Sequence, residues 1–315
     1  MWRMEHPIRS LHHVTATVDD AQQDLDFCLD VLGLRLVKKT VNFDNHNVYH
    51  FYYGDETGTP GTIWTTFPYK GWNIPGGTKG LGQVGVTSFS VPEGSLPFWR
   101  SRLAAHGITA ADAPARWGEP ALVFPDPSGL IIELVAAADA RVPWTHGSVP
   151  EAHAIRGLHS VAMIIDSPKS TVALLERLLG CVVVDESDGR IRLAVNGDRP
   201  GHRLDILHGT GAAPARNGIG TVHHVALAIS SPDEQRRLRQ ELIDYGCRVT
   251  EVRDRCYFES IYFREPGGVL IEVATMQPGF TLDEAAGELG RALKLPPWEE
   301  PKRKAIEEEL PVIST

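Results

Sequence analysis

The stretch Val222-His-His-Val-Ala-Leu-Ala-Ile229 repeats the pattern of Leu11-His-His-Val-Thr-Ala-Thr-Val18 near the other end of the chain. Two further copies lie between them, Leu81-Gly-Gln-Val-Gly-Val-Thr-Ser88 and Leu158-His-Ser-Val-Ala-Met-Ile-Ile165. Each copy is rich in apolar and β-branched residues, as expected of a buried strand. A recurring segment of this kind predicts four copies of one structural module, each opening on a strand.

The rest of each module follows the same order. A helical pattern comes after each opening strand and ends at a glycine; the four helices are expected over Asp20 to Leu32, Leu96 to His106, Ser170 to Leu179 and Pro232 to Tyr245. A glycine-led strand closes each module, at Gly61 to Thr65, Gly129 to Glu133, Gly201 to Asp205 and Gly268 to Glu272. Four tandem βαβββ units predict an α+β fold.

Chain order suggests that neighbouring modules pair into two domains. The first would be 8–136, with modules 8–69 and 79–136, and the second 157–276, with modules 157–209 and 219–276. A linker is expected at 137–156 because Pro143 and Pro150 interrupt it. The segment 277–315 lies outside the repeats and is expected to be a C-terminal helical extension.

Composition narrows the classes of function. The chain has 315 residues, a formal net charge of -9 and a pI near 5.8. No basic stripe stands out, so we expect no nucleic-acid partner. Neither the opening residues Met1 to Pro7 nor any later run resembles a signal peptide or a membrane span, so we expect a cytoplasmic protein with no membrane partner. The four cysteines form no CxxC pair, which argues against disulfides and thiolate zinc sites.

The repeat pattern resembles the vicinal oxygen chelate superfamily, which includes glyoxalases, extradiol dioxygenases and drug-sequestering proteins. The resemblance covers residues 8 to 275. It implies that two modules form an open, half-barrel sheet around a metal, with ligands on the opening and closing strands. Fold alone does not fix function, so the candidate ligands must be weighed by their chemistry.

The repeat places His13, Gln83, Ser160 and His224 at the opening-strand position and Thr65, Glu133, Asp205 and Glu272 at the closing-strand position. Combining modules one and four gives His13, His224 and Glu272, the two-histidine, one-carboxylate set typical of iron(II) oxygenases. Combining modules one and two gives His13, Gln83 and Glu133, closer to glyoxalase-type isomerases.

A single histidine on an apolar strand is usually a hydrogen-bonded core residue. Here, however, a His-His doublet recurs at equivalent positions of two modules. Because adjacent side chains on a strand face opposite ways, only one member of each doublet should bind metal, and the alignment favours His13 and His224.

One branch of the superfamily, the hydroquinone ring-cleaving dioxygenases, looks especially similar. The shared strings are Leu36-Val-Lys-Lys-Thr-Val-Asn-Phe43, Tyr49-His-Phe-Tyr-Tyr-Gly-Asp-Glu56, Pro60-Gly-Thr-Ile-Trp-Thr-Thr-Phe-Pro68, Arg255-Cys-Tyr-Phe-Glu-Ser-Ile-Tyr262 and Pro266-Gly-Gly-Val-Leu-Ile-Glu272. The resemblance implies Fe(II), with Mn(II) as a substitute, at His13, His224 and Glu272, and O₂ as co-substrate. It also implies that His12, Thr15, His223, Arg255 and Tyr262 surround the substrate. His50 is a further candidate.

The expected activity is extradiol-type cleavage of a hydroquinone or catechol-like aromatic. Arg255 would stabilise developing negative charge, and Tyr262 or a flanking histidine would move protons. The partner would be a small aromatic substrate, and a homo-oligomer is compatible with the sequence. Two other classes remain open: a nickel- or zinc-dependent glyoxalase-type isomerase or lyase, and a protein that binds aromatic compounds without catalysis.

Overall fold

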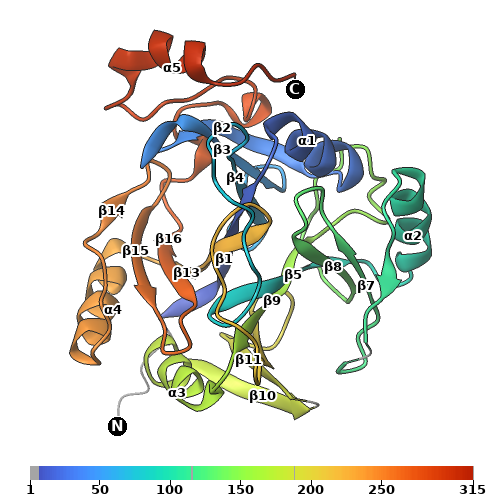
Figure 1. Ribbon diagram of the computed structural model, residues 1–315, viewed down its shortest axis with the longest axis vertical. Helices are drawn as coiled ribbons and strands as arrows, with labels where there is room; N and C mark the ends of the chain where they lie inside the picture. Colours follow the sequence, from blue (N-terminus) through green and yellow to red (C-terminus); the bar gives the residue numbers. More distant parts are fainter. Residues whose placement is uncertain (1–6, 115, 188, 315) are drawn as a thin grey trace.

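The computed structural model describes residues 7–114, 116–187 and 189–314 and contains two eight-stranded sheets (Figure 1). The first sheet has the strand order β14-β15-β16-β13-β1-β4-β3-β2, and the second has the order β10-β11-β12-β9-β5-β8-β7-β6. With five α-helices in this part of the chain, the fold is α+β, as the sequence predicted. The opening residues, in which the sequence predicts no signal peptide, lie outside the described part of the chain up to residue 6.

The first sheet is built by modules one and four. Module one supplies β1 (Ile8–Val18), α1 (Ala21–Asp26) with its π-helical continuation η1 (Phe27–Val31), β2 (Arg35–Asn42), β3 (Asn45–Gly54) and β4 (Ile63–Pro68). Module four supplies β13 (Thr221–Ile229), α4 (Pro232–Asp244), β14 (Arg253–Asp254), β15 (Glu259–Arg264) and β16 (Leu270–Thr275). Each module is thus the predicted strand, helix and three strands.

The second sheet is built by modules two and three. Module two consists of β5 (Gln83–Val91), α2 (Leu96–Ala105), β6 (Ala111–Asp112), β7 (Ala121–Pro125) and β8 (Ile131–Ala136). Module three consists of β9 (Gly157–Ile165), α3 (Pro168–Leu179), β10 (Cys181–Ser187), β11 (Arg190–Val195) and β12 (Arg203–His208).

The sheets correct the pairing suggested by chain order. Sequence neighbours, modules one with two and three with four, were expected to pair, but β1 pairs with β13 and β5 pairs with β9. The other strands of a module all lie on one side of its opening strand, so each opening strand keeps a free edge. That edge can pair with any other opening strand, and chain order does not decide which. The boundaries 8–136 and 157–276 stay a prediction; the segment 137–156 contains neither helix nor strand.

Local sequence explains how the helices dock. Helix α4 begins after Ser231, whose side chain accepts a hydrogen bond from the Glu234 amide, with Pro232 in the first turn. Gln235 lies on the buried face of this helix, and its side-chain amide donates to the main-chain oxygens of Glu259 and Val273. This contact holds α4 on the outer side of β15 and β16, so the other face of the sheet is left to form the site.

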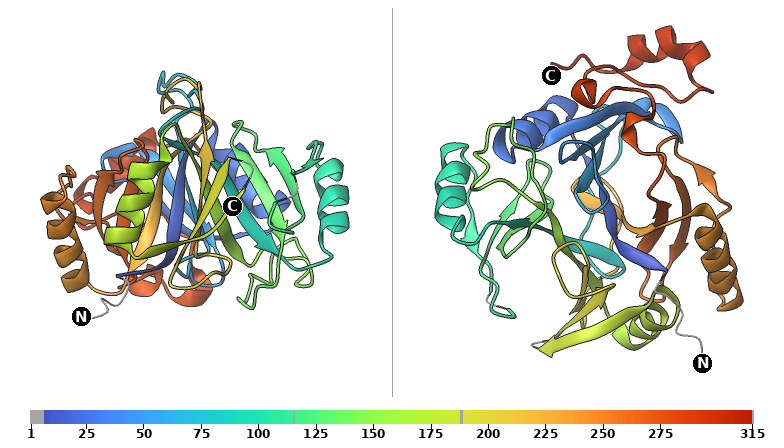
Figure 2. Two further views of the ribbon diagram at one scale, coloured as in Figure 1. Left: turned by 90° about the horizontal axis from the view of Figure 1, so that it is seen from below. Right: turned by 180° about the vertical axis from the view of Figure 1, so that it is seen from behind.

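The C-terminal segment packs across module one (Figure 2). It contains η2 (Phe280–Leu282), η3 (Ala286–Glu288), η4 (Glu300–Lys302) and one α-helix, α5 (Arg303–Glu309). Lys38 on β2 is fully buried and forms ion pairs with Asp283 and Glu284 of this segment. The segment therefore covers the edge strand β2. Throughout the described residues, no helix has the length and apolarity needed to cross a bilayer.

Candidate metal centre

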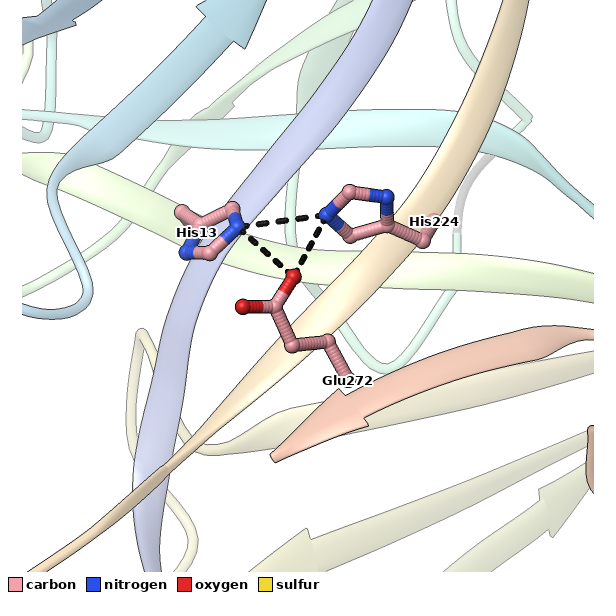
Figure 3. Close-up of side chains that lie close together, drawn as sticks. All are labelled: His13, His224 and Glu272. Atoms are coloured by element: carbon pink, nitrogen blue, oxygen red, sulfur yellow. Dashed lines mark hydrogen bonds and ion pairs between the residues drawn. The ribbon is translucent and has the colours of Figure 1, made fainter. Parts of the chain in front are cut away.

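Three side chains from neighbouring strands of the first sheet point toward one another (Figure 3). His13 lies on β1, His224 on β13 and Glu272 on β16. Glu272 Oε2 is 2.7 Å from His224 Nε2 and 3.3 Å from His13 Nε2, and the two imidazole nitrogens are 3.3 Å apart. Among the described residues this is the one group of three or more His, Cys, Asp or Glu side chains whose ligand atoms converge in this way.

Strand register brings the two histidines together. In the β1–β13 pair, His13 lies opposite Ala226 and His224 lies opposite Thr15, so a local two-fold relation links modules one and four. Ala226 in turn pairs with Glu272 on β16, and Thr15 pairs with Thr65 on β4. The two-fold relation therefore matches Glu272 with Thr65, which leaves three ligand-type side chains at this centre rather than four.

The three side chains are almost completely buried. Burial alone would raise the pKa of Glu272, but the imidazoles of His13 and His224 outweigh it and hold that pKa well below its usual value. Burial lowers the pKa of His224. Glu272 Oε1 accepts a hydrogen bond from Ser260, whereas the buried Oε2 has no hydrogen bond of acceptable geometry. Oε2 is therefore left to face the imidazoles.

This donor set fits a divalent metal. Ligands at about 2.1 Å in neighbouring octahedral positions lie about 3 Å apart, close to the three observed separations of 2.7, 3.3 and 3.3 Å. Two imidazoles and one carboxylate occupying one triangular face suit iron(II). The geometry thus has the shape of a metal site built from the two outer modules.

The first histidine of each doublet, His12 or His223, forms a hydrogen bond with the second, His13 or His224. His12 Nδ1 lies 2.8 Å from His13 Nδ1, and His223 Nδ1 lies 2.7 Å from His224 Nδ1. These contacts fix the ring orientation of His13 and His224 and leave the Nε2 atom of each facing Glu272. Burial, followed by the neighbouring imidazole, lowers the pKa of His12 and of His223 to about 3, so both are neutral.

A cavity of about 280 Å³ opens beside the triad. Four of the five residues expected to surround the substrate line it, namely Thr15, His223, Arg255 and Tyr262. The fifth, His12, is not part of the lining. Arg255 Nε donates to Tyr262 Oη at 3.1 Å, and its Nη2 donates to Asp44 Oδ2 at 3.1 Å. Burial and nearby Glu272 raise the pKa of Tyr262, so its phenol keeps its proton.

Sequence reasoning missed several residues of this cavity. His50 lines it as a further candidate, and the residues not anticipated include Asp44, Tyr52, Phe67 and Phe258. Asp44 lies in the turn between β2 and β3 and reaches Arg253 and Arg255, so the two ends of the curled sheet meet over the cavity. The sequence signal that could have identified Asp44 is the mostly polar segment Asn42-Phe43-Asp44-Asn45, which indicates a turn between two strands.

The alternative ligand set from modules one and two is not assembled. Val86 lies opposite Ala162, as His13 lies opposite Ala226, so Val86 and not Gln83 is the structural counterpart of His13. The counterpart of Leu11 is Val84 rather than Leu81, so the sequence alignment of module two was three residues out. Gln83 donates to Asn217, and Glu133 pairs with Arg116 and Ser88. Asp205 forms a bidentate ion pair with Arg192, so ion pairs occupy both closing-strand positions of the second sheet.

Comparison with known proteins gives consistent relationships. Residues 10–134 and 157–273 match the model of the glyoxalase/bleomycin resistance protein/dioxygenase superfamily. The chain is 42% identical over 306 residues to MhqE of Bacillus subtilis, provisionally named a ring-cleaving dioxygenase, covering 96% of this chain and 98% of that protein. It is 33% identical over 304 residues to the chlorohydroquinone/hydroquinone 1,2-dioxygenase of Sphingobium indicum, covering 94% of each.

Solved structures show the same fold. A crystal structure of a provisionally named dioxygenase from Bacillus subtilis superimposes with a TM-score of 0.94 at 39% identity and covers 98% of this chain and 99% of that one. Glyoxalase I from Zea mays has a TM-score of 0.63 at 14% identity, covering 84% and 92% of the two chains. The second likeness concerns the fold alone.

Proposed function

Because the chain belongs to the glyoxalase/bleomycin resistance protein/dioxygenase superfamily, we propose that it is a ring-cleaving dioxygenase that binds iron(II) through His13, His224 and Glu272 and opens a hydroquinone-type ring with O₂. The relatives named as ring-cleaving and hydroquinone dioxygenases support the reaction class. The observation that carries the proposal is the convergence of two imidazole nitrogens and one carboxylate oxygen beside a cavity.

The three-ligand arrangement favours oxygen chemistry over isomerisation. The position related by the two-fold to Glu272 is Thr65, whose hydroxyl bonds to Thr15. A three-ligand facial set leaves positions open for substrate and O₂. When bound, iron(II) in such a set supplies the one-electron and O₂ chemistry that ring cleavage needs.

The chain's own residues would prepare the substrate. Tyr52, Phe67 and Phe258 give the cavity aromatic walls that suit a planar ring. The neutral imidazole of His223 is placed to take the proton of a ring hydroxyl. Arg255, held by Tyr262 and Asp44, would stabilise the negative charge that develops on the opening ring.

Oxygen uptake tests this proposal. The protein would be loaded with Fe(II) under nitrogen, and O₂ consumption measured with methylhydroquinone, chlorohydroquinone and catechol. We expect uptake to be lost in His13→Ala and Glu272→Ala and kept in Glu133→Ala, a matched carboxylate of the second sheet. Turnover of methylglyoxal and glutathione without O₂ would instead identify an isomerase, and absence of any turnover with tight aromatic binding would identify a binding protein.

A further inference from the structure

His50 is a buried cavity residue with an incomplete set of hydrogen bonds. Its Nε2 lies 2.9 Å from Thr65 Oγ1, and Thr65 Oγ1 lies 2.9 Å from Thr15 Oγ1. The imidazole packs against Tyr52 at 4.0 Å and Phe67 at 4.3 Å between ring centroids. Two aromatic neighbours and one hydrogen bond therefore fix the orientation of the imidazole.

The two-fold relation explains why an imidazole is found here. On β15, Tyr262 pairs with Glu272, and Ser260, two residues earlier, bonds to Glu272. On β3, Tyr52 pairs with Thr65, and His50, two residues earlier, bonds to Thr65. Module four thus combines the long side chain of Glu272 with a small serine. Module one combines the short side chain of Thr65 with the larger imidazole of His50. The imidazole of His50 therefore takes the place that Ser260 has in module four, as the side chain bonded to the closing-strand residue.

The free ring nitrogen of His50 is available to a ligand. With Nε2–H donating to Thr65, the neutral imidazole carries a bare acceptor at Nδ1. Nδ1 has no hydrogen-bond partner among the described residues, and it is not one of their buried unpartnered atoms, so it is open to the cavity that His50 lines. Burial, followed by the nearby imidazoles of His13 and His224, keeps the pKa of His50 well below its usual value, so the acceptor persists at neutral pH.

His50 lies across the cavity floor from the wall that carries Tyr262. The triad strands β16, β13 and β1 are adjacent in the sheet, and β3 follows only after β4. A hydroquinone with one oxygen at the triad carries its second hydroxyl on the far side of the ring, whereas a catechol carries it on the neighbouring carbon. The buried second hydroxyl needs an acceptor, because a buried hydroxyl without a hydrogen-bond partner loses binding free energy.

We propose that His50 determines the specificity of this cavity: its Nδ1 accepts a hydrogen bond from the ring hydroxyl remote from His13, His224 and Glu272, so that 1,4-diols are selected over phenols that lack this group. The inference rests on the proposed function, since it names the class of substrate that the site would take. Arg255 can only donate hydrogen bonds, and Asp44 is engaged by two arginines. His50 is a neutral acceptor that lines the same cavity.

Ligand binding without turnover tests the proposal. Zinc(II) holds the same ligand types but is redox-inactive, so zinc-loaded protein would be titrated calorimetrically under nitrogen with hydroquinone, phenol and catechol. One hydrogen bond together with two equivalent hydroxyls predicts that hydroquinone binds roughly fivefold to twenty-fivefold more tightly than phenol. In His50→Phe the ratio should fall to about the twofold that the two equivalent hydroxyls give.

Two further variants complete the test. His50→Gln keeps an acceptor and should retain part of the preference, while the exposed His208→Phe in the second sheet should leave the ratio unchanged. Catechol affinity should change little in His50→Phe. A preference that survives in His50→Phe, or unaltered protein that binds hydroquinone no better than phenol or binds neither, would overturn the proposal. Because no turnover is measured, this outcome is independent of whether the protein consumes O₂.

Discussion

Glu272 shows how one residue is prepared by its neighbours. One carboxylate oxygen is held by Ser260 and the other is left facing two imidazole nitrogens. Hydrogen bonds to the outer oxygen of a ligating carboxylate fix its direction and strengthen metal binding. Ser88 makes the same kind of bond to Glu133 in the second sheet, where the carboxylate partner is an arginine.

This comparison gives a residue-scale prediction. Ser260→Ala removes the bond that orients Glu272, and we expect the affinity for Fe(II) to fall by roughly tenfold to a hundredfold. The dissociation constant would be measured anaerobically by competition with a chelator. Ser88→Ala removes the matched bond of the second sheet and should leave the affinity unchanged. Equal affinities in Ser260→Ala and the unaltered protein would contradict the role given to this serine.

At the scale of elements, α1 is joined to the first sheet through a buried carboxylate. Asp24 on α1 accepts hydrogen bonds from Tyr53 on β3 and Thr66 on β4. These bonds lower its pKa, but burial outweighs them and raises it from 3.8 to about 6. The ionised form is therefore a cost to the folded state at neutral pH.

The sign of this effect fixes an element-scale prediction. The folded protein holds the Asp24 proton more tightly than the unfolded chain, so this stabilisation is complete below pH 3.8 and is lost as pH rises through about 6. At about 1.4 kcal/mol per pH unit, the loss is roughly 3 kcal/mol. Asp24→Asn should unfold at a higher urea concentration than the unaltered protein at pH 8, with the difference shrinking toward pH 4. The exposed Asp26→Asn of the same helix is the control, and a difference that grows toward acid would refute the account.

The elements were the part of the structure most accessible from sequence. The opening strands, four helices and closing strands recur with recognisable apolar patterns, and His13, His224 and Glu272 stood out because two modules share a doublet. Chain order did not give the partner of each opening strand, because any opening strand can pair at its free edge; only the ligand chemistry of modules one and four pointed to the β1–β13 pair. The sequence did not show that His50 and Asp44 lie beside the triad, because their place depends on how the sheet curls. Gln83 was misplaced because the spacing of Leu81 and Val84 imitates that of Leu11 and Val14 three residues too early.

At the scale of the whole molecule, each sheet unites the two halves of the chain. His13 comes from the first half, and His224 and Glu272 come from the second, so the centre exists only when β1 pairs with β13. The second sheet repeats the architecture, but its two closing-strand carboxylates, Glu133 and Asp205, form ion pairs with arginines. Among the described residues, the candidate metal ligands therefore all lie on the first sheet.

This arrangement predicts the behaviour of a divided chain. Residues 1–147 and 148–315, separated within the segment that lacks helices and strands, should each fail to bind Fe(II) tightly. Expressed together, the two pieces should re-form both sheets and bind one metal per pair, as measured by metal analysis after gel filtration. Stoichiometric iron on 148–315 alone would show that β1 is dispensable for the site.

The central claim is that one iron ion is bound where the two outer modules meet. The most direct measurement is an anomalous diffraction map at the iron absorption edge, from crystals of the protein loaded with Fe(II) under nitrogen. We predict a single strong peak per chain between His13 Nε2, His224 Nε2 and Glu272 Oε2. A peak beside Glu133 or elsewhere in the second sheet, or no peak at the triad, would contradict the account.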